Sequence, residues 1–187
     1  MRRALHLVLL LSCAAAVAAQ STEKLNQDSR VLKDFSRRVG DYVKLHKAVQ
    51  SEIHRLKPTN SPEAIEHYEH HLAHDIRETR RHAIQGDIFT PEISAEFRRL
   101  TGIAMQGPDA ARVRQSLQHA APVYSRDIRV NSPYPAGLPL QSTPPSLLLN
   151  LPPLPPEVEY RVVGQHGLIL RDIDANLVVD AIPNAIP

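Results

Sequence analysis

The sequence has 187 residues, and its 22 Lys and Arg against 20 Asp and Glu give a formal net charge of +2. Arg2 and Arg3 account for this excess, so the chain from Gln20 onward is neutral, and the whole chain has only 3 Phe, 5 Tyr and no Trp. Such a chain offers neither the basic stripe nor the stacking aromatic rings that nucleic-acid binding needs. We therefore expect no nucleic-acid partner, and the length allows one domain with tails.

Residues 1–19 have the pattern of an export signal: two arginines, an apolar run and a tract of small residues. This pattern predicts a signal peptide cleaved after Ala18 or Ala19, and hence a periplasmic or secreted protein. The alternative is a lipoprotein box ending at Cys13, and we expect membrane attachment only in that case. Cys13 is the only cysteine, so a mature chain without it has no disulfide, thiol nucleophile or Cys-ligated zinc.

A long amphipathic helix is predicted over residues 32–56. Its apolar stripe follows the alternating three- and four-residue spacing of a coiled-coil seam. The stripe consists of Leu32, Phe35, Val39, Tyr42, His46, Val49, Ile53 and Leu56. For His46 we expect a hydrogen-bonded position in or beside the seam and not a role as a ligand.

Three further helices are predicted after this one. The second begins at a cap formed by Asn60 or Ser61 and ends near Gln85, and the third and fourth begin near Thr90 and Gly107. The short connection between the first two helices favours an antiparallel hairpin. We therefore predict a small helical bundle over residues 20–121.

The remainder of the chain changes character twice. Residues 122–156 contain ten prolines, a density that excludes a long helix and predicts a semi-rigid linker, or alternatively a ligand for an aromatic groove on a partner. Residues 157–187 contain three short β-type runs, at 157–164, 168–173 and 177–182, separated by turn residues. They predict a meander that either lies on the helices or pairs its edge with another chain.

The predicted fold class is therefore mainly α. It comprises a signal peptide (1–19), a small antiparallel helical bundle or hairpin (20–121), a Pro-rich extended segment (122–156) and a short C-terminal β-meander (157–187).

A cluster of histidines on the second helix is the one pattern that indicates chemistry. His67, His70, His71 and His74 fall on the face opposite the apolar stripe. His67 with His71, and His70 with His74, have the i, i+4 spacing at which two imidazoles can chelate one ion, and imidazole suits zinc, nickel and copper. The two other interpretations are an ordinary solvated face that is rich in histidine and a pH-dependent surface.

The motifs of common enzyme sites are absent from the sequence. It contains no His-Glu-x-x-His, Glu-x-x-His or Gly-x-Ser-x-Gly pattern and no phosphate-binding loop. We therefore predict that the protein is not an enzyme.

In layout, an exported helical hairpin with a His-rich face resembles the small periplasmic metal-resistance and stress-accessory proteins. The likeness covers only the helical half of the chain. The Leu-Thr-x-x-Gln signature of those proteins is not met, because the glutamine after Leu100 and Thr101 is Gln106. The likeness is one of architecture.

Two functions follow as expectations. The first is an exported, non-catalytic helical protein that acts in interaction or envelope structure, as a homo-oligomer or on an envelope protein. The alternative is periplasmic binding of a divalent transition metal, zinc, nickel or copper, through His67, His70, His71 and His74.

Overall fold

The computed structural model describes residues 2–53, 58–118, 128–135, 141–164 and 166–187, with side chains from Asn26 onward except that of Gln141. The helices are α1 (Arg2–Glu52), α2 (Pro62–Thr79), α3 (Pro91–Ala104), α4 (Ala110–Gln118) and α5 (Pro145–Leu148). The strands are β1 (Ser132–Pro133), β2 (Gln141–Ser142), β3 (Val158–Val163), β4 (Gly167–Asp172) and β5 (Leu177–Ile182). They form one antiparallel sheet in the order β1-β5-β4-β3-β2.

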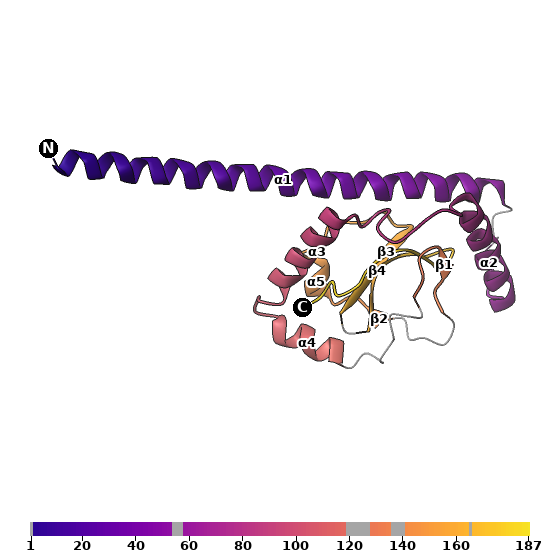
Figure 1. The fold of residues 1–187 in the computed structure, drawn as a ribbon. Coiled ribbons are helices and arrows are strands. Elements are labelled where there is room, and N and C mark those ends of the chain that lie inside the picture. Colours follow the sequence, from indigo (N-terminus) through magenta and orange to yellow (C-terminus); the bar gives the residue numbers. More distant parts are fainter. Residues whose placement is uncertain (1, 54–57, 119–127, 136–140, 165) are drawn as a thin grey trace.

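The predicted fold class, mainly α with a helical bundle or hairpin, is wrong: the protein is mixed α/β. Its core lies between the sheet and the helices, with α1 across one face of the sheet (Figure 1). α2 crosses the C-terminal end of α1 steeply and does not lie antiparallel beside it (Figure 1). The reason is that the apolar side of the strands offers α1 a wider surface to cover than a second helix does.

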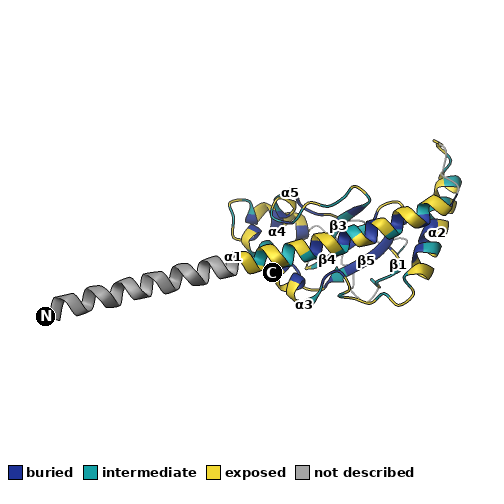
Figure 2. Ribbon diagram, turned by 90° about the horizontal axis from the view of Figure 1, so that it is seen from above, coloured by how far each residue is buried: buried dark blue, intermediate teal, exposed yellow. Residues whose placement is uncertain are grey.

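The apolar stripe of α1 lies where the sequence predicts it. Phe35, Val39, Tyr42, His46, Val49 and Ile53 are buried, Leu32 is half-buried, and Leu56 lies outside the described residues. Figure 2 shows the same helix from above, with buried positions on the side that faces the strands and exposed positions on the outer side. The spacing alone therefore identified the buried face correctly but not the surface that covers it.

Three strands of the sheet begin and end within one residue of the predicted β-type runs. The side chains of β3 and β4 alternate between the two faces, as in a pleated strand, whereas a bulge opposite Leu170 and Arg171 interrupts the alternation in β5. The face toward α1 contributes Val158, Tyr160, Val162, Leu168, Leu170, Leu177 and Val179 to the main core. The meander thus lies on the helices, the first of the two expected arrangements.

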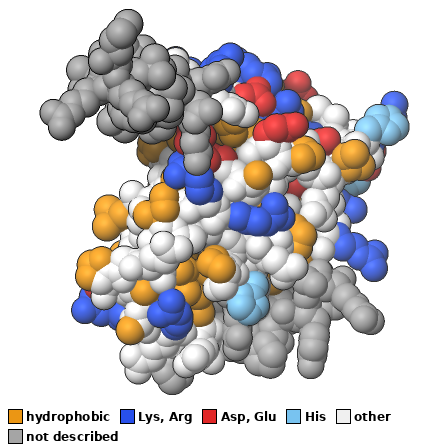
Figure 3. Space-filling model, turned by 60° about the vertical axis from the view of Figure 1, so that its left-hand side comes forward, with side chains coloured by type: hydrophobic (Ala, Val, Ile, Leu, Met, Phe, Trp, Pro, Cys, Tyr) orange, Lys and Arg blue, Asp and Glu red, His pale blue; other side chains and the backbone are white. Residues whose placement is uncertain are grey.

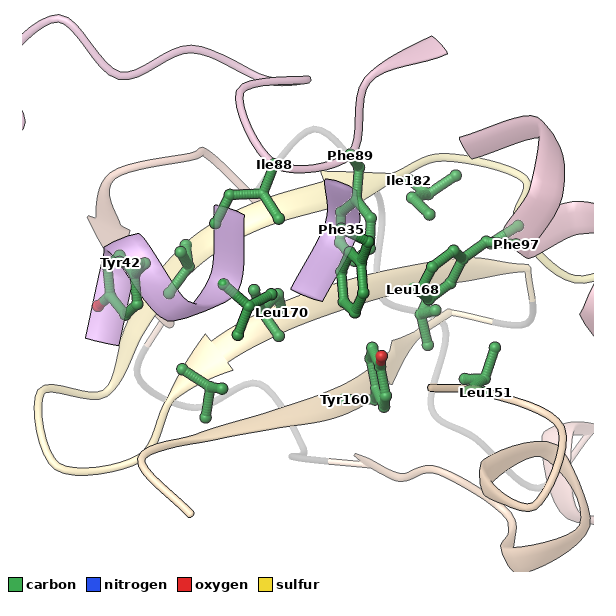
Figure 4. Packing of buried hydrophobic residues seen from close by; sticks show 14 of the residues in the cluster. Phe35, Tyr42, Ile88, Phe89, Phe97, Leu151, Tyr160, Leu168, Leu170 and Ile182 are labelled. Atoms are coloured by element: carbon green, nitrogen blue, oxygen red, sulfur yellow. The ribbon is translucent and has the colours of Figure 1, made fainter. Parts of the chain in front are cut away.

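Aromatic rings form the centre of this core (Figure 4). The ring of Phe35, from α1, lies 4.9 Å from that of Phe97 in α3, 5.7 Å from that of Phe89 and 6.4 Å from that of Tyr160 in β3. These distances are typical of favourable edge and offset-stacked contacts. The cluster therefore joins α1, α3, the loop before α3 and the sheet.

The described parts of the proline-rich stretch pack against the rest of the chain. β1 pairs with β5 and β2 pairs with β3, so two-residue strands occupy both edges of the sheet. Leu147 and Leu151 are buried in the main core, while Leu148 and Leu149 are exposed. Short edge strands of this kind limit pairing with other chains.

The helix starts follow the predicted capping residues. Ser61 Oγ accepts a hydrogen bond from the Ala64 N–H at 3.2 Å, and Thr90 Oγ1 accepts one from the Ile93 N–H at 3.3 Å. Each cap satisfies a backbone donor that lacks a partner within its helix. α2 lies below the C-terminal end of α1, and α3 lies below its middle (Figure 1).

Candidate functional site: the histidine face of α2

The second half of α2 packs against the rest of the protein, whereas its first half is largely exposed. Its buried residues are Leu72, Ala73 and Ile76, and its C-terminus is held by Asn131, whose Nδ2 donates to the carbonyl oxygens of Arg77 and Arg80 at 3.2 and 3.0 Å. Of the apolar residues on the side opposite the histidines, Leu72 and Ile76 are buried, whereas Ile65 near the start of the helix is 45% exposed. The opposite side of the helix is open to solvent.

The structure places His67, His70, His71 and His74 on this exposed side. The ring centroids of His67 and His71 are 6.3 Å apart in an edge-to-face arrangement. His71 Nε2 lies 3.5 Å from Asp75 Oδ2. The i, i+4 spacing thus brings one imidazole pair and a carboxylate into a row along the helix.

Within one chain, each i, i+4 histidine pair offers two ligands to a metal ion. Among the residues that the structure describes, no three His, Cys, Asp or Glu side chains lie close enough to hold a metal ion. A structural zinc ion takes four ligands, and other divalent transition metals take four to six. Metal binding through these histidines stays a prediction, and any ion held this way has open positions.

A second polar cluster, not singled out in the sequence, lies buried between α1 and the β4–β5 turn. Tyr42 Oη donates to Asp172 Oδ2 at 2.6 Å, and His46 Nδ1 lies 2.6 Å from the same oxygen. Asp172 Oδ1 accepts from the Ala175 N–H at 2.9 Å. His46 and Asp172 are both 0% exposed, so this cluster ties α1 to the sheet and has no contact with solvent.

The hydrogen bonds determine the protonation of His46. Because Asp172 accepts from its neighbours, Nδ1 of His46 is a donor, and Nε2 is the nitrogen that gains the second proton. Nε2 has no hydrogen-bond partner, and Asp174 Oδ2 lies 3.8 Å from it. Burial lowers the pKa of His46, but the hydrogen bond and charge of Asp172 and the charges of Asp174 and Glu157 outweigh it and raise the pKa above 6.5.

A third buried group, Asp180 in β5, holds the loop between α2 and α3. Its carboxylate accepts from the N–H groups of Gly86, Ile88 and Phe89 at 3.0, 2.8 and 2.7 Å. Three such donors are typical of a structural carboxylate that replaces missing backbone partners. An aspartate inside an otherwise apolar strand is the signal that could have identified Asp180, whereas Asp172 is the last residue of β4 and follows Arg171.

Comparison of the chain with protein families, with curated proteins and with solved structures finds no match. Within the part of the chain that the structure describes, no helix is both long and apolar enough to cross a membrane. The side chains of the predicted signal, residues 1–19 with Cys13, lie outside the described ones.

The free energy of unfolding should fall as the pH rises from about 6.5 through the raised pKa of His46. A raised folded-state pKa means that its imidazolium stabilises the fold fully below the unfolded value of about 6.5 and that this contribution is lost as the pH rises through the folded value. Urea unfolding at about pH 6, 7 and 8.5 measures how the free energy of unfolding changes with pH. His46→Gln should flatten this dependence, and Asp172→Asn should cost about 3–5 kcal/mol by leaving His46 buried without its counter-charge.

The control for this measurement is the H67Q/H70Q/H71Q/H74Q variant, which removes the exposed imidazoles and keeps His46. It should show the same decrease in the free energy of unfolding with rising pH as the parent protein. If the pH dependence of the free energy of unfolding is unchanged in His46→Gln but lost in this control, its assignment to His46 and Asp172 is contradicted.

Proposed function

We propose that the protein is an exported, non-catalytic binding protein and that the histidine face of α2 is its binding surface for a divalent transition-metal ion. The observation that supports this most directly is the exposed pair of His67 and His71, whose ring centroids are 6.3 Å apart, with the half-buried carboxylate of Asp75 3.5 Å from the second imidazole. Imidazole nitrogens are favoured ligands of zinc, nickel and copper.

The neighbouring charges favour a cation at this surface. α2 contains five acidic residues, Glu63, Glu66, Glu69, Asp75 and Glu78, against the single basic residue Arg77. A solvated helix face usually consists of Lys and Glu, whereas four of its positions here are imidazoles that bind a metal in their neutral form. An ion of charge +2 therefore meets both ligands and a compensating negative field.

Support for a non-catalytic role comes from where the polar groups lie. Tyr42, His46 and Asp172 are all buried, and the phenol and imidazole both point at the same carboxylate. The pKa of Tyr42 is raised well above its usual value by burial and by the adjacent Asp172 carboxylate, so its hydroxyl stays a donor. Catalytic groups need a concave site that a substrate can enter, and this arrangement serves the packing of α1.

Calorimetric titration of untagged, metal-stripped protein with Zn²⁺, Ni²⁺ and Cu²⁺ tests the metal proposal. We expect saturable binding with a dissociation constant of about 1 μM or tighter. The H67Q/H70Q/H71Q/H74Q variant should lose this binding while keeping its far-UV circular dichroism, because the four side chains are exposed. Unsaturable heat in the parent protein, or equal binding in the variant, would contradict the proposal.

The expected role in interaction or envelope structure is a second candidate, and the surface around α5 favours it. Leu149 is 87% exposed and Leu148 is 43% exposed. Leu148 also lines an open groove of about 410 Å³ together with Pro152, Pro153 and Leu154. Figure 3 shows hydrophobic side chains and Lys and Arg spread over the face that it presents, while acidic side chains lie mainly near its upper edge. Such a surface suits a polypeptide partner.

A photo-crosslinking amino acid at position 149 tests this second candidate in cells. If Leu149 contacts a partner, irradiation should give a discrete adduct of higher mass. The matched control places the same amino acid at Ser51, an exposed position on α1, and should give none. Adducts at neither position, or equally at both, would contradict a specific interaction through α5.

A further inference from the structure

The histidines of α2 form two parallel rows, each flanked by carboxylates. The first row is Glu63, His67, His71 and Asp75, and the second is Glu66, His70, His74 and Glu78. Successive members of a row are four residues apart, which is about 6 Å along a helix and about 40° around it. The four imidazoles therefore occupy an arc of about 100° and form two chelating pairs side by side.

Neither pair can complete the coordination of an ion from its own chain. Asp75 lies beyond His71 along the first row, so an ion held between His67 and His71 is on the other side of His71 from this carboxylate. No third His, Cys, Asp or Glu joins either pair among the described residues. A four-coordinate ion bound to one pair thus has two positions left for ligands from outside the chain.

We infer that these open positions are filled by the same rows of a second copy, so that metal ions join two molecules of this protein through their α2 helices. This inference rests on the proposed metal binding and adds its partner and stoichiometry. In a two-fold symmetric contact, the histidine face of one molecule lies against the same face of the other. The two histidine pairs of one molecule then meet the two pairs of the other, which gives two ions, each bound by two imidazoles from each chain.

The position of α2 allows this contact. The helix stands at one end of the molecule in both ribbon views (Figures 1 and 2). Its buried residues Leu72, Ala73 and Ile76 lie opposite the rows, and His67, His70 and His74 are exposed. A convex helix face can approach an identical face closely, whereas a recessed one cannot.

Charge makes the association depend on metal. With neutral histidines, α2 has five acidic residues and one basic residue, so two of these helices repel each other when no ion is present. Two divalent ions between them supply four positive charges at the place where the negative charges gather. The metal is therefore both the bridging ligand and the counter-charge for the contact.

Analytical ultracentrifugation of untagged protein at about 50 μM, first with EDTA and then with two equivalents of Zn²⁺, tests the inference. We expect the mass of one chain in EDTA, which is 20.8 kDa for all 187 residues and less without residues 1–19, and a mass doubled by Zn²⁺ and reversed by adding EDTA again. The row variants H67Q/H71Q and H70Q/H74Q should each weaken dimerisation at least tenfold, and the fourfold variant should abolish it.

The matched control is His82→Gln, which removes an exposed histidine beyond the end of α2 and should dimerise like the parent. Saturable zinc binding with the mass unchanged would overturn the dimer and leave the proposed metal binding intact. No zinc binding at all would overturn both. A dimer already present in EDTA, or a mass that rises without limit as Zn²⁺ is added, would also overturn the bridged pair.

Discussion

The packing of α1 on the sheet is the contact on which the rest of the structure depends. The face of the antiparallel sheet that contributes to the main core has to be covered, and here the stripe from Phe35 to Ile53 covers it. Phe35 meets rings from the loop before α3, from α3 and from β3, so one side chain joins four parts of the chain. The remaining helices are attached around this layer.

Two buried carboxylates add directional hydrogen bonds to the apolar contact between α1 and the sheet. Asp172 binds Tyr42 and His46 of α1, and Asp180 binds the backbone of the loop from Gly86 to Phe89. Hydrophobic burial is non-directional, whereas these bonds are satisfied in one register only. They therefore fix the positions of α1 and of the α2–α3 loop along the direction of the strands. This in turn orients α2 with its histidine face outward.

The sequence predicted local structure well because local structure depends on local signals. The stripe of α1, the caps at Ser61 and Thr90 and the three C-terminal strands all follow from spacing and turn chemistry. The fold class was wrong because an amphipathic stripe does not specify whether a helix or a sheet covers it. His46 was expected to be hydrogen-bonded in the seam, but Asp172, 126 residues away, has no local signal that names it as the partner.

The same limit applies to the candidate site. Spacing placed His67, His70, His71 and His74 on one exposed face, since that requires only the helical period. It could not supply further ligands, which depend on how distant elements or a second molecule approach. The molecule thus separates two kinds of histidine: His46 is part of the packing of α1, and the α2 histidines are available to a ligand.

Side-chain NMR of ¹⁵N-labelled histidine tests this separation most directly, because one titration with pH and with Zn²⁺ reports every imidazole. The account predicts that His46 keeps a proton on Nδ1, that its midpoint lies above 6.5 and that Zn²⁺ leaves its signals unmoved while those of His67, His70, His71 and His74 shift together. A His46 that titrates at the ordinary value and responds to Zn²⁺, with the α2 imidazoles unmoved, would contradict it.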